Sequence, residues 1–193
     1  MTSRSLIAAI EPGSCFAGSL LELALAADRS FQLAGVFEDK APTADSNTGE
    51  PATITLGDMN LGPLTMSNGL TRLQTRFWGD EAGYEAAAKR KNEPLEAEDA
   101  ADLGLVTFAP DDIDWDDELR IATEERASFS PDALTGLEAN YRFAGPETME
   151  TKIFGRLTAW QNWIFNRPNA SGPDGALRRF GTGQRAVFDR KRV

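Results

Sequence analysis

The fold is decided by residues 5–28, which read SLIAAIEPGSCFAGSLLELALAAD. The uninterrupted apolar run at residues 6–10 predicts a short strand that is buried on both faces and is ended by a Pro-Gly pair. A helix is predicted over residues 16–28, and because it is apolar around nearly its whole circumference we expect it to be buried. Glu22, in the middle of this helix, is the residue that we favour most for proton-transfer chemistry.

The rest of the chain alternates strands and helices before it becomes wholly helical. Further strands are predicted at residues 31–36, 53–56 and 105–108. Helices are predicted at residues 67–78, 80–91, 95–103, 116–128, 131–143 and 146–166, and a mobile polar loop at residues 39–51. This order predicts an α/β fold with a helical C-terminal region, divided into residues 1–109 and 110–193.

The composition excludes several classes of function. The net charge of -10 and a pI near 4.6 argue against nucleic-acid binding and against binding to anionic membranes. The chain has no histidine, so Ser–His–Asp catalysis, Cys–His catalysis and His-ligated zinc sites are excluded within it. The single cysteine, Cys15, allows no internal disulfide, which fits the reducing cytoplasm. Acid–base chemistry must fall to Asp, Glu, Lys, Tyr or Cys15, and we expect no metal site.

The N-terminal residues faintly resemble a secretory signal peptide. However, Glu11 interrupts the first apolar run and Glu22 the second, and a signal peptide needs roughly 7–15 uninterrupted apolar residues. No stretch approaches the roughly 20 apolar residues that span a membrane. We therefore expect a cytoplasmic protein with no membrane contact.

The strand, turn and helix of residues 5–28 resemble those of the crotonase (enoyl-CoA hydratase/isomerase) superfamily. In that family a helix with a Glu-Leu-Ala…Asp run follows a strand and a glycine-rich turn. Three later segments resemble the family in the same order, namely ITLGDMNLG (54–62), NGLTRL (68–73) and LEAEDAADLGLV (95–106). The resemblance implies the C-terminal half of the crotonase-like ββα spiral, followed by a helical C-terminal extension.

The C-terminal third carries a more specific resemblance. Residues 145–165, together with 109–115, 130–136 and 11–18, are similar to a ring-opening branch of the superfamily that acts in aerobic benzoyl-CoA degradation. Members of that branch are much longer, so we expect this chain to be the C-terminal part of such an enzyme. The resemblance implies conversion of 2,3-epoxybenzoyl-CoA with water to 3,4-didehydroadipyl-CoA semialdehyde and formate. CoA is then part of the acyl-CoA substrate, no cofactor is implied, and we expect the full-length enzyme to be a homo-oligomer.

The resemblance also assigns roles to individual residues. Glu22 and Asp58 match the two hydratase carboxylates that share acid and base roles, although Asp58 is one methylene shorter than the usual Glu. The backbone N–H of Ser19, after Gly18, matches an oxyanion-hole donor at the N-terminus of the helix. The family usually has glycine at the position of Ser19, but the backbone performs this role.

Alternatives stand beside each of these roles. Without the resemblance, a lone glutamate on an apolar helix usually lies at its rim or is satisfied by an arginine, and Asp58 is an ordinary loop acid. The candidates for the substrate pocket are Cys15, Phe16 and Asn60. Cys15 is more often a small buried residue, whereas Asn60 has the groups to hydrogen-bond a hydroxylated intermediate.

Two other functions remain open at this point. One is a generic enoyl-CoA hydratase or isomerase, for which Asp58 and the long C-terminal region are awkward. The other is an inactive truncated module that only assembles with a partner. Residues 171–193 carry six basic and two acidic side chains, a net of +4, and either neutralise CoA phosphates or lie on the surface. The Trp160 and Trp163 stripe is interpreted as packing, within the chain or across a subunit boundary.

Overall fold

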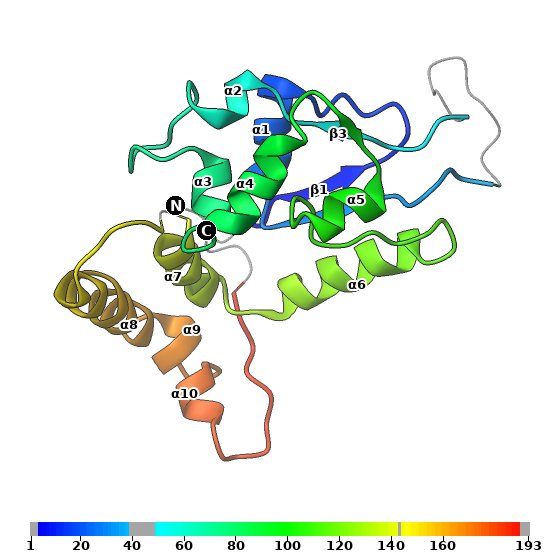
Figure 1. Ribbon diagram of the computed structural model, residues 1–193. Helices are drawn as coiled ribbons and strands as arrows, with labels where there is room; N and C mark the ends of the chain where they lie inside the picture. Colours follow the sequence, from blue (N-terminus) through cyan, green and yellow to red (C-terminus); the bar gives the residue numbers. More distant parts are fainter. Residues whose placement is uncertain (1–3, 39–48, 143, 190–193) are drawn as a thin grey trace. The chain divides into compact units, whose positions relative to one another are not determined.

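Figure 1 shows the computed structural model, which describes residues 4–38, 49–142 and 144–189. The chain divides into two compact units, Ser5–Glu124 and a second unit that begins at Glu125. The boundary falls within helix α6 (Trp115–Ser128), whereas the sequence suggested one after residue 109. The predicted domain division remains a prediction. Most of the loop expected at residues 39–51 lies outside the described residues.

The first unit alternates short strands with helices, which confirms the predicted α/β class. Its strands are β1 (Ile7–Ile10), β2 (Arg29–Gln32), β3 (Ile54–Thr55) and β4 (Pro94–Leu95). Its helices are η1 (Gly18–Leu20), α1 (Leu21–Leu25), α2 (Asp58–Leu61), α3 (Arg72–Arg76), α4 (Glu81–Lys89), α5 (Ala97–Asp102) and the start of α6. η1 is a single 3-10 turn that continues directly into α1, so the predicted helix at residues 16–28 is present but shorter.

Two small sheets organise this unit. β1 and β2 pair in parallel, with Ile7 opposite Arg29 and Ile10 opposite Gln32, and the connection between them contains η1 and α1. β3 and β4 pair antiparallel. An isolated parallel bridge between Ala17 and Thr55 brings β3 beside the turn that precedes η1.

The strand predicted at residues 105–108 is wrong. In the structure only Phe108 bridges to Phe31 of β2, and the two rings stack with their centroids 5.0 Å apart. The N–H groups of Thr107 and Phe108 both donate to the same carbonyl, that of Ser30. A regular ladder needs a separate acceptor for each bond, so the shared acceptor interrupts the ladder at residues 107–108, although Gln32 N and Ala34 N donate to the carbonyls of Phe108 and Pro110 further along.

The core of the first unit is apolar and draws on segments far apart in the sequence. Its fully buried side chains include Ile10, Leu21, Phe31, Leu33, Leu56, Leu73, Leu95 and Trp115. Trp115 satisfies its indole N–H by donating to Glu11 Oε1 at 2.9 Å, as a buried tryptophan requires. This bond ties the start of α6 to the end of β1.

The helix formed by η1 and α1 buries one face and not its whole circumference. Leu21, Glu22, Ala24 and Leu25 are buried, whereas Leu20 and Leu23 are 47% and 61% exposed. The expectation of burial on all sides is therefore wrong for the chain as it stands. Asp28, after the helix, exchanges hydrogen bonds with Leu6: its Oδ2 accepts from Leu6 N at 2.7 Å, and its N–H donates to Leu6 O. These two hydrogen bonds hold the residue before β1 to the residue before β2.

The second unit is helical, as the sequence predicted. It contains α7 (Pro131–Tyr141), η2 (Thr151–Thr158), α8 (Ala159–Phe165), α9 (Pro168–Ser171) and α10 (Ala176–Arg179). η2 is wound as a π-helix and runs on into α8. Of the predicted basic tail, residues 190–193 lie outside the described residues, and Asp189 N donates to Asn169 Oδ1 at 2.9 Å.

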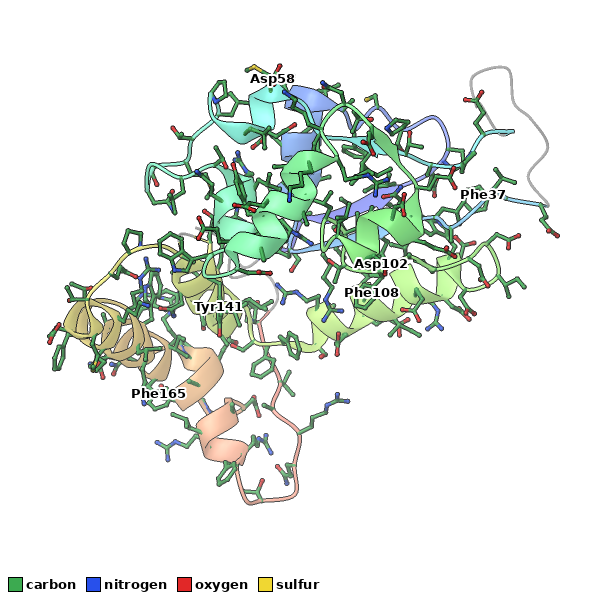
Figure 2. The ribbon with its side chains drawn as sticks, viewed as in Figure 1. Phe37, Asp58, Asp102, Phe108, Tyr141 and Phe165 are labelled. Carbon is green, nitrogen blue, oxygen red and sulfur yellow. The ribbon has the colours of Figure 1, made fainter. Side chains whose placement is uncertain are left out.

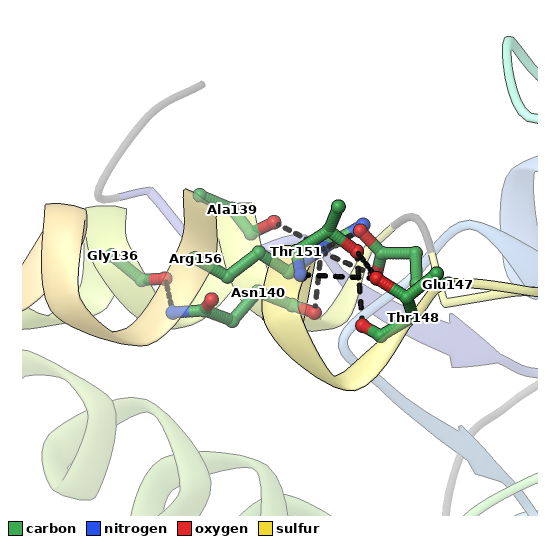
Figure 3. Close-up of polar contacts among 7 residues, drawn as sticks. All are labelled: Gly136, Ala139, Asn140, Glu147, Thr148, Thr151 and Arg156. Carbon is green, nitrogen blue, oxygen red and sulfur yellow. Dashed lines mark hydrogen bonds and ion pairs between the residues drawn. The ribbon is translucent and has the colours of Figure 1, made fainter. Parts of the chain in front are cut away.

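Arg156 holds the hairpin of α7 and η2–α8 together (Figure 3). Its Nη1 donates to the carbonyls of Ala139 and Asn140 at the C-terminal end of α7, at 3.0 and 3.1 Å, and its Nε pairs with Glu147. Two carbonyls that the end of a helix leaves without intrahelical partners are satisfied in this way. Along the described segments, no helix combines the length and the apolar character needed to cross a membrane.

Candidate functional site

Glu22 is a buried carboxylate with two partners. It lies in the first turn of α1 with 6% of its surface exposed. Oε1 accepts from Asn60 Nδ2 at 2.7 Å, and Oε2 accepts from Arg72 Nη1 at 3.0 Å. The surround is thus not purely apolar, and the alternative of a glutamate satisfied by an arginine is the one observed. A buried charge is tolerated when it is both paired and hydrogen-bonded, and both conditions hold here.

Asn60 links three backbone or side-chain groups of the site. Its Nδ2 donates to Gly18 O at 2.8 Å as well as to Glu22, and its Oδ1 accepts from Gly57 N at 2.9 Å. The residue is completely buried. Two acceptors face one end of the amide and one donor faces the other, so the network defines which end is nitrogen.

The turn that leads into the helix is held close to α2. Gly18 adopts a φ of +50°, in the left-handed region that favours glycine, and the N–H of Ser19 lies in the first turn, where amides have no intrahelical partner. A Cβ added at Gly57 would lie 3.3 Å from the Cα of Gly18. α2 lies against η1, as Figure 1 shows. The two backbones are therefore already in contact.

Arg72 is placed by the N-terminal cap of α3. Thr71 Oγ1 accepts from Gln74 N at 3.1 Å, and Gln74 Oε1 accepts from Thr71 N at 2.9 Å, which is a reciprocal capping box. This cap sets where α3 begins and so fixes Arg72 in its first turn. The guanidinium reaches Glu22 while its side chain remains 33% exposed.

Comparison with known proteins identifies the fold. No protein-family model matches the chain. An enoyl-CoA hydratase from Geobacillus kaustophilus superposes on 97% of the chain with a TM-score of 0.67 at 19% identity, and the chain covers 62% of that protein. An enoyl-CoA hydratase/isomerase from Mycobacterium paratuberculosis superposes on 97% of the chain with a TM-score of 0.66 at 13% identity, with 61% of that protein covered. The chain has the crotonase fold of the enoyl-CoA hydratases.

Similarity in sequence is more specific than the crotonase fold. The chain is 55% identical over all of its 193 residues to benzoyl-CoA-dihydrodiol lyase from Aromatoleum evansii. It spans 33% of the length of that lyase. The resemblance seen in the sequence is confirmed, and because only a third of the relative is matched, the activity of the whole protein is a matter for proposal.

Asp58, unlike Glu22, lies on the surface of this crotonase-fold chain. Its side chain is 80% exposed and pairs with Lys91 Nζ at 2.6 Å, and Figure 2 shows it at the outer edge of α2. Asp58 and Asn60 are two positions apart in the same short helix, which places them on roughly opposite faces. Asn60 takes the inward direction and reaches Glu22. The two predicted carboxylates thus differ in burial and in partners, and the catalytic roles of the pair stay a prediction.

The other predicted pocket residues lie in different environments. Cys15 is exposed, so the interpretation as a small buried residue is wrong. Phe16 packs against the core, and its carbonyl accepts from Thr55 N at 3.1 Å. The engagement of every polar atom of Asn60 within the chain favours a supporting role over contact with a substrate. Within the described parts of the chain, no three His, Cys, Asp or Glu side chains gather as a metal site would require.

Two residues of this site were missed from the sequence. Arg72 stands in the NGLTRL segment that the resemblance singled out, 50 positions from its partner Glu22. Its appearance in that motif was the available signal. Gly57 lies directly before Asp58 in the ITLGDMNLG segment, which was likewise the available signal, but its φ of -126° is open to any residue and only the approach of Gly18 demands glycine.

Proposed function

We propose that this chain forms part of the active site of an acyl-CoA lyase, with Glu22 as its proton-transfer group and the N–H of Ser19 as one donor to the thioester oxyanion. The observation that supports it most is a buried carboxylate, held by two partners, that is tied through Asn60 to the turn carrying Ser19. A carboxylate and a backbone amide fixed together supply the proton transfer and the oxyanion stabilisation that thioester chemistry needs.

The substrate that we propose is 2,3-epoxybenzoyl-CoA. This follows the similarity to benzoyl-CoA-dihydrodiol lyase, a name that describes a lyase acting on a dihydrodiol of benzoyl-CoA. Two molecules of water are consumed: water opens the ring, and cleavage of a carbon–carbon bond then yields 3,4-didehydroadipyl-CoA semialdehyde and formate. CoA enters as part of the substrate, and the reaction is placed in the cytoplasm, in a homo-oligomer of the longer protein.

The specific observation against a generic hydratase is the placement of Asp58. A hydratase that divides acid and base roles between two carboxylates needs both near the substrate, and the side chain of Asp58 is exposed and paired with Lys91. In the proposed lyase, Glu22 is the carboxylate that is held in place for proton transfer, and a role for Asp58 remains a prediction. Turnover of crotonyl-CoA at a rate that equals or exceeds that of 2,3-epoxybenzoyl-CoA would favour the hydratase.

The test compares the chain by itself with the chain supplemented by the rest of a benzoyl-CoA-dihydrodiol lyase, each incubated with 2,3-epoxybenzoyl-CoA. Formate release is the readout, and Glu22→Gln is the decisive variant because it keeps the shape of the side chain and removes its proton transfer. Removing a general acid or base costs about 10²–10⁴ in rate. Turnover that survives this variant would remove Glu22 from the mechanism. Absence of both turnover and CoA binding in both preparations would favour an inactive module.

A further inference from the structure

We propose that Asn60 is a positioning residue that holds the carboxylate of Glu22 and the Gly18–Ser19 turn in one fixed arrangement. The inference rests on the proposed function for its catalytic meaning, but its geometry stands separately. A single planar amide donates to Gly18 O at 2.8 Å and to Glu22 Oε1 at 2.7 Å from the same nitrogen. The proton-transfer group and the oxyanion turn are therefore joined through one atom.

The third bond of Asn60 fixes the amide itself. Its Oδ1 accepts from Gly57 N at 2.9 Å, so the side chain is anchored to the first turn of its own helix, α2. With both N–H groups and the oxygen engaged in a completely buried position, a rotation of the side chain would break buried hydrogen bonds. The amide therefore acts as a rigid spacer.

Close packing leaves this spacer little room for movement. The Cα of Gly18 lies so near Gly57 that an added Cβ would approach it to 3.3 Å. Contacts this short require the neighbour to move by a few tenths of an ångström. A misplacement of about 1 Å in an active site can cost about 10²-fold in rate, so even a small displacement of the turn matters. Gly57 and Asn60 together thus set the distance between α2 and the turn.

Two substitutions test the spacer in different ways. Asn60→Asp keeps an acceptor for Gly57 N but loses both donated bonds, and it places a second carboxylate beside Glu22. Gly57→Ala removes no polar group and instead pushes on the turn through its Cβ. Matched controls are Asn162→Ala on the exposed face of α8, and Gly62→Ala, where an added Cβ meets nothing within 4 Å.

The first measurement is independent of activity. In ¹⁵N–¹H spectra of the full chain, Asn60→Asp is expected to shift the amide resonances of Gly18 and Ser19. The Gly57 amide, which retains an acceptor, is expected to exchange as slowly as in the unsubstituted chain. Gly57→Ala is expected to shift the same two resonances, and the controls are expected to leave them unchanged. Unshifted Gly18 and Ser19 resonances in both variants, with the chain folded, overturn the inference. If one variant fails to fold, the other decides.

The second measurement links the spacer to chemistry. In the preparation that turns over 2,3-epoxybenzoyl-CoA, both variants are expected to lower kcat by about 10–10²-fold with KM changed less than about 3-fold. A loss confined to KM, or none, overturns the positioning role even when the resonances shift. If the unsubstituted chain supports no turnover at all, the proposed function fails, and the amide resonances still decide whether Asn60 sets the turn.

Discussion

Replacing Arg72 by methionine tests whether Glu22 is a paired buried charge. Removing one partner of a buried ion pair costs about 3–5 kcal/mol, because the other charge is left uncompensated. Here the side chain of Arg72 is 33% exposed and Asn60 still donates to the carboxylate. Water therefore offers part of the lost stabilisation, and we expect Arg72→Met to lower the free energy of unfolding by about 2–3 kcal/mol.

The assay is a double-mutant cycle measured by urea unfolding, with the midpoint and slope determined separately. In a Glu22→Gln background the partner of Arg72 is neutral, so Arg72→Met leaves no buried charge uncompensated. The substitution is then expected to lower the free energy of unfolding by less than about 1 kcal/mol. The control is Arg120→Met, which removes an exposed ion pair with Asp117 and should give no resolvable change. Equal costs of Arg72→Met in both backgrounds would refute the reasoning, because the effect of Arg72 would then not pass through Glu22.

Four further substitutions test other parts of the structure. Gly136→Ala places a Cβ 2.8 Å from Ile164 Cδ1, which must shift; because the gain of alanine inside a helix offsets part of this crowding, the net cost in thermal unfolding should be about 0.5–2 kcal/mol. Gly155→Ala meets nothing within 4 Å and should instead stabilise by about 0.5–1 kcal/mol. Burial lowers the pKa of Arg76, so the charge on this side chain is costly to bury. Arg76→Met should therefore change the free energy of unfolding by less than about 1 kcal/mol, although the hydrogen bond to Gly104 O is lost. A loss as large as that of Arg72→Met would contradict this expectation. Trp115→Phe should cost about 1–3 kcal/mol in urea unfolding, because Glu11 Oε1 loses its partner, and unchanged stability would show that this bond contributes nothing.

The strand, turn and helix of residues 5–28 could be predicted because each depends on local pattern. An apolar run, a Pro-Gly break and a second apolar run with one acid specify β1 and α1 without reference to the rest of the chain. The burial of Glu22 followed from the same pattern. Its partners did not, because Asn60 and Arg72 lie 38 and 50 positions away and only the folded chain brings them together.

The placement of Asp58 shows where prediction from the sequence ended. The motif aligned Asp58 with a catalytic acid, but whether position 58 or 60 points inward depends on the rotation of a four-residue helix about its axis. That rotation is fixed by two contacts, of Gly57 with the backbone of Gly18 and of Asn60 with its carbonyl. Neither contact leaves a periodic signal in the sequence, so the outward direction of Asp58 could not be inferred.

The two partners of Glu22 do not prevent it from taking part in proton transfer. A carboxylate offers about four lone-pair sites, and Asn60 and Arg72 use one on each oxygen. A site therefore remains on each oxygen for a water or a substrate hydroxyl, with neither bond broken. Because Arg72 is partly exposed whereas Asn60 is completely buried, we expect solvent or substrate to approach the carboxylate from the side that faces Arg72. We therefore expect different roles for the two residues: Asn60 would fix the position of the carboxylate, and Arg72 would lie on the side from which a reacting group meets it.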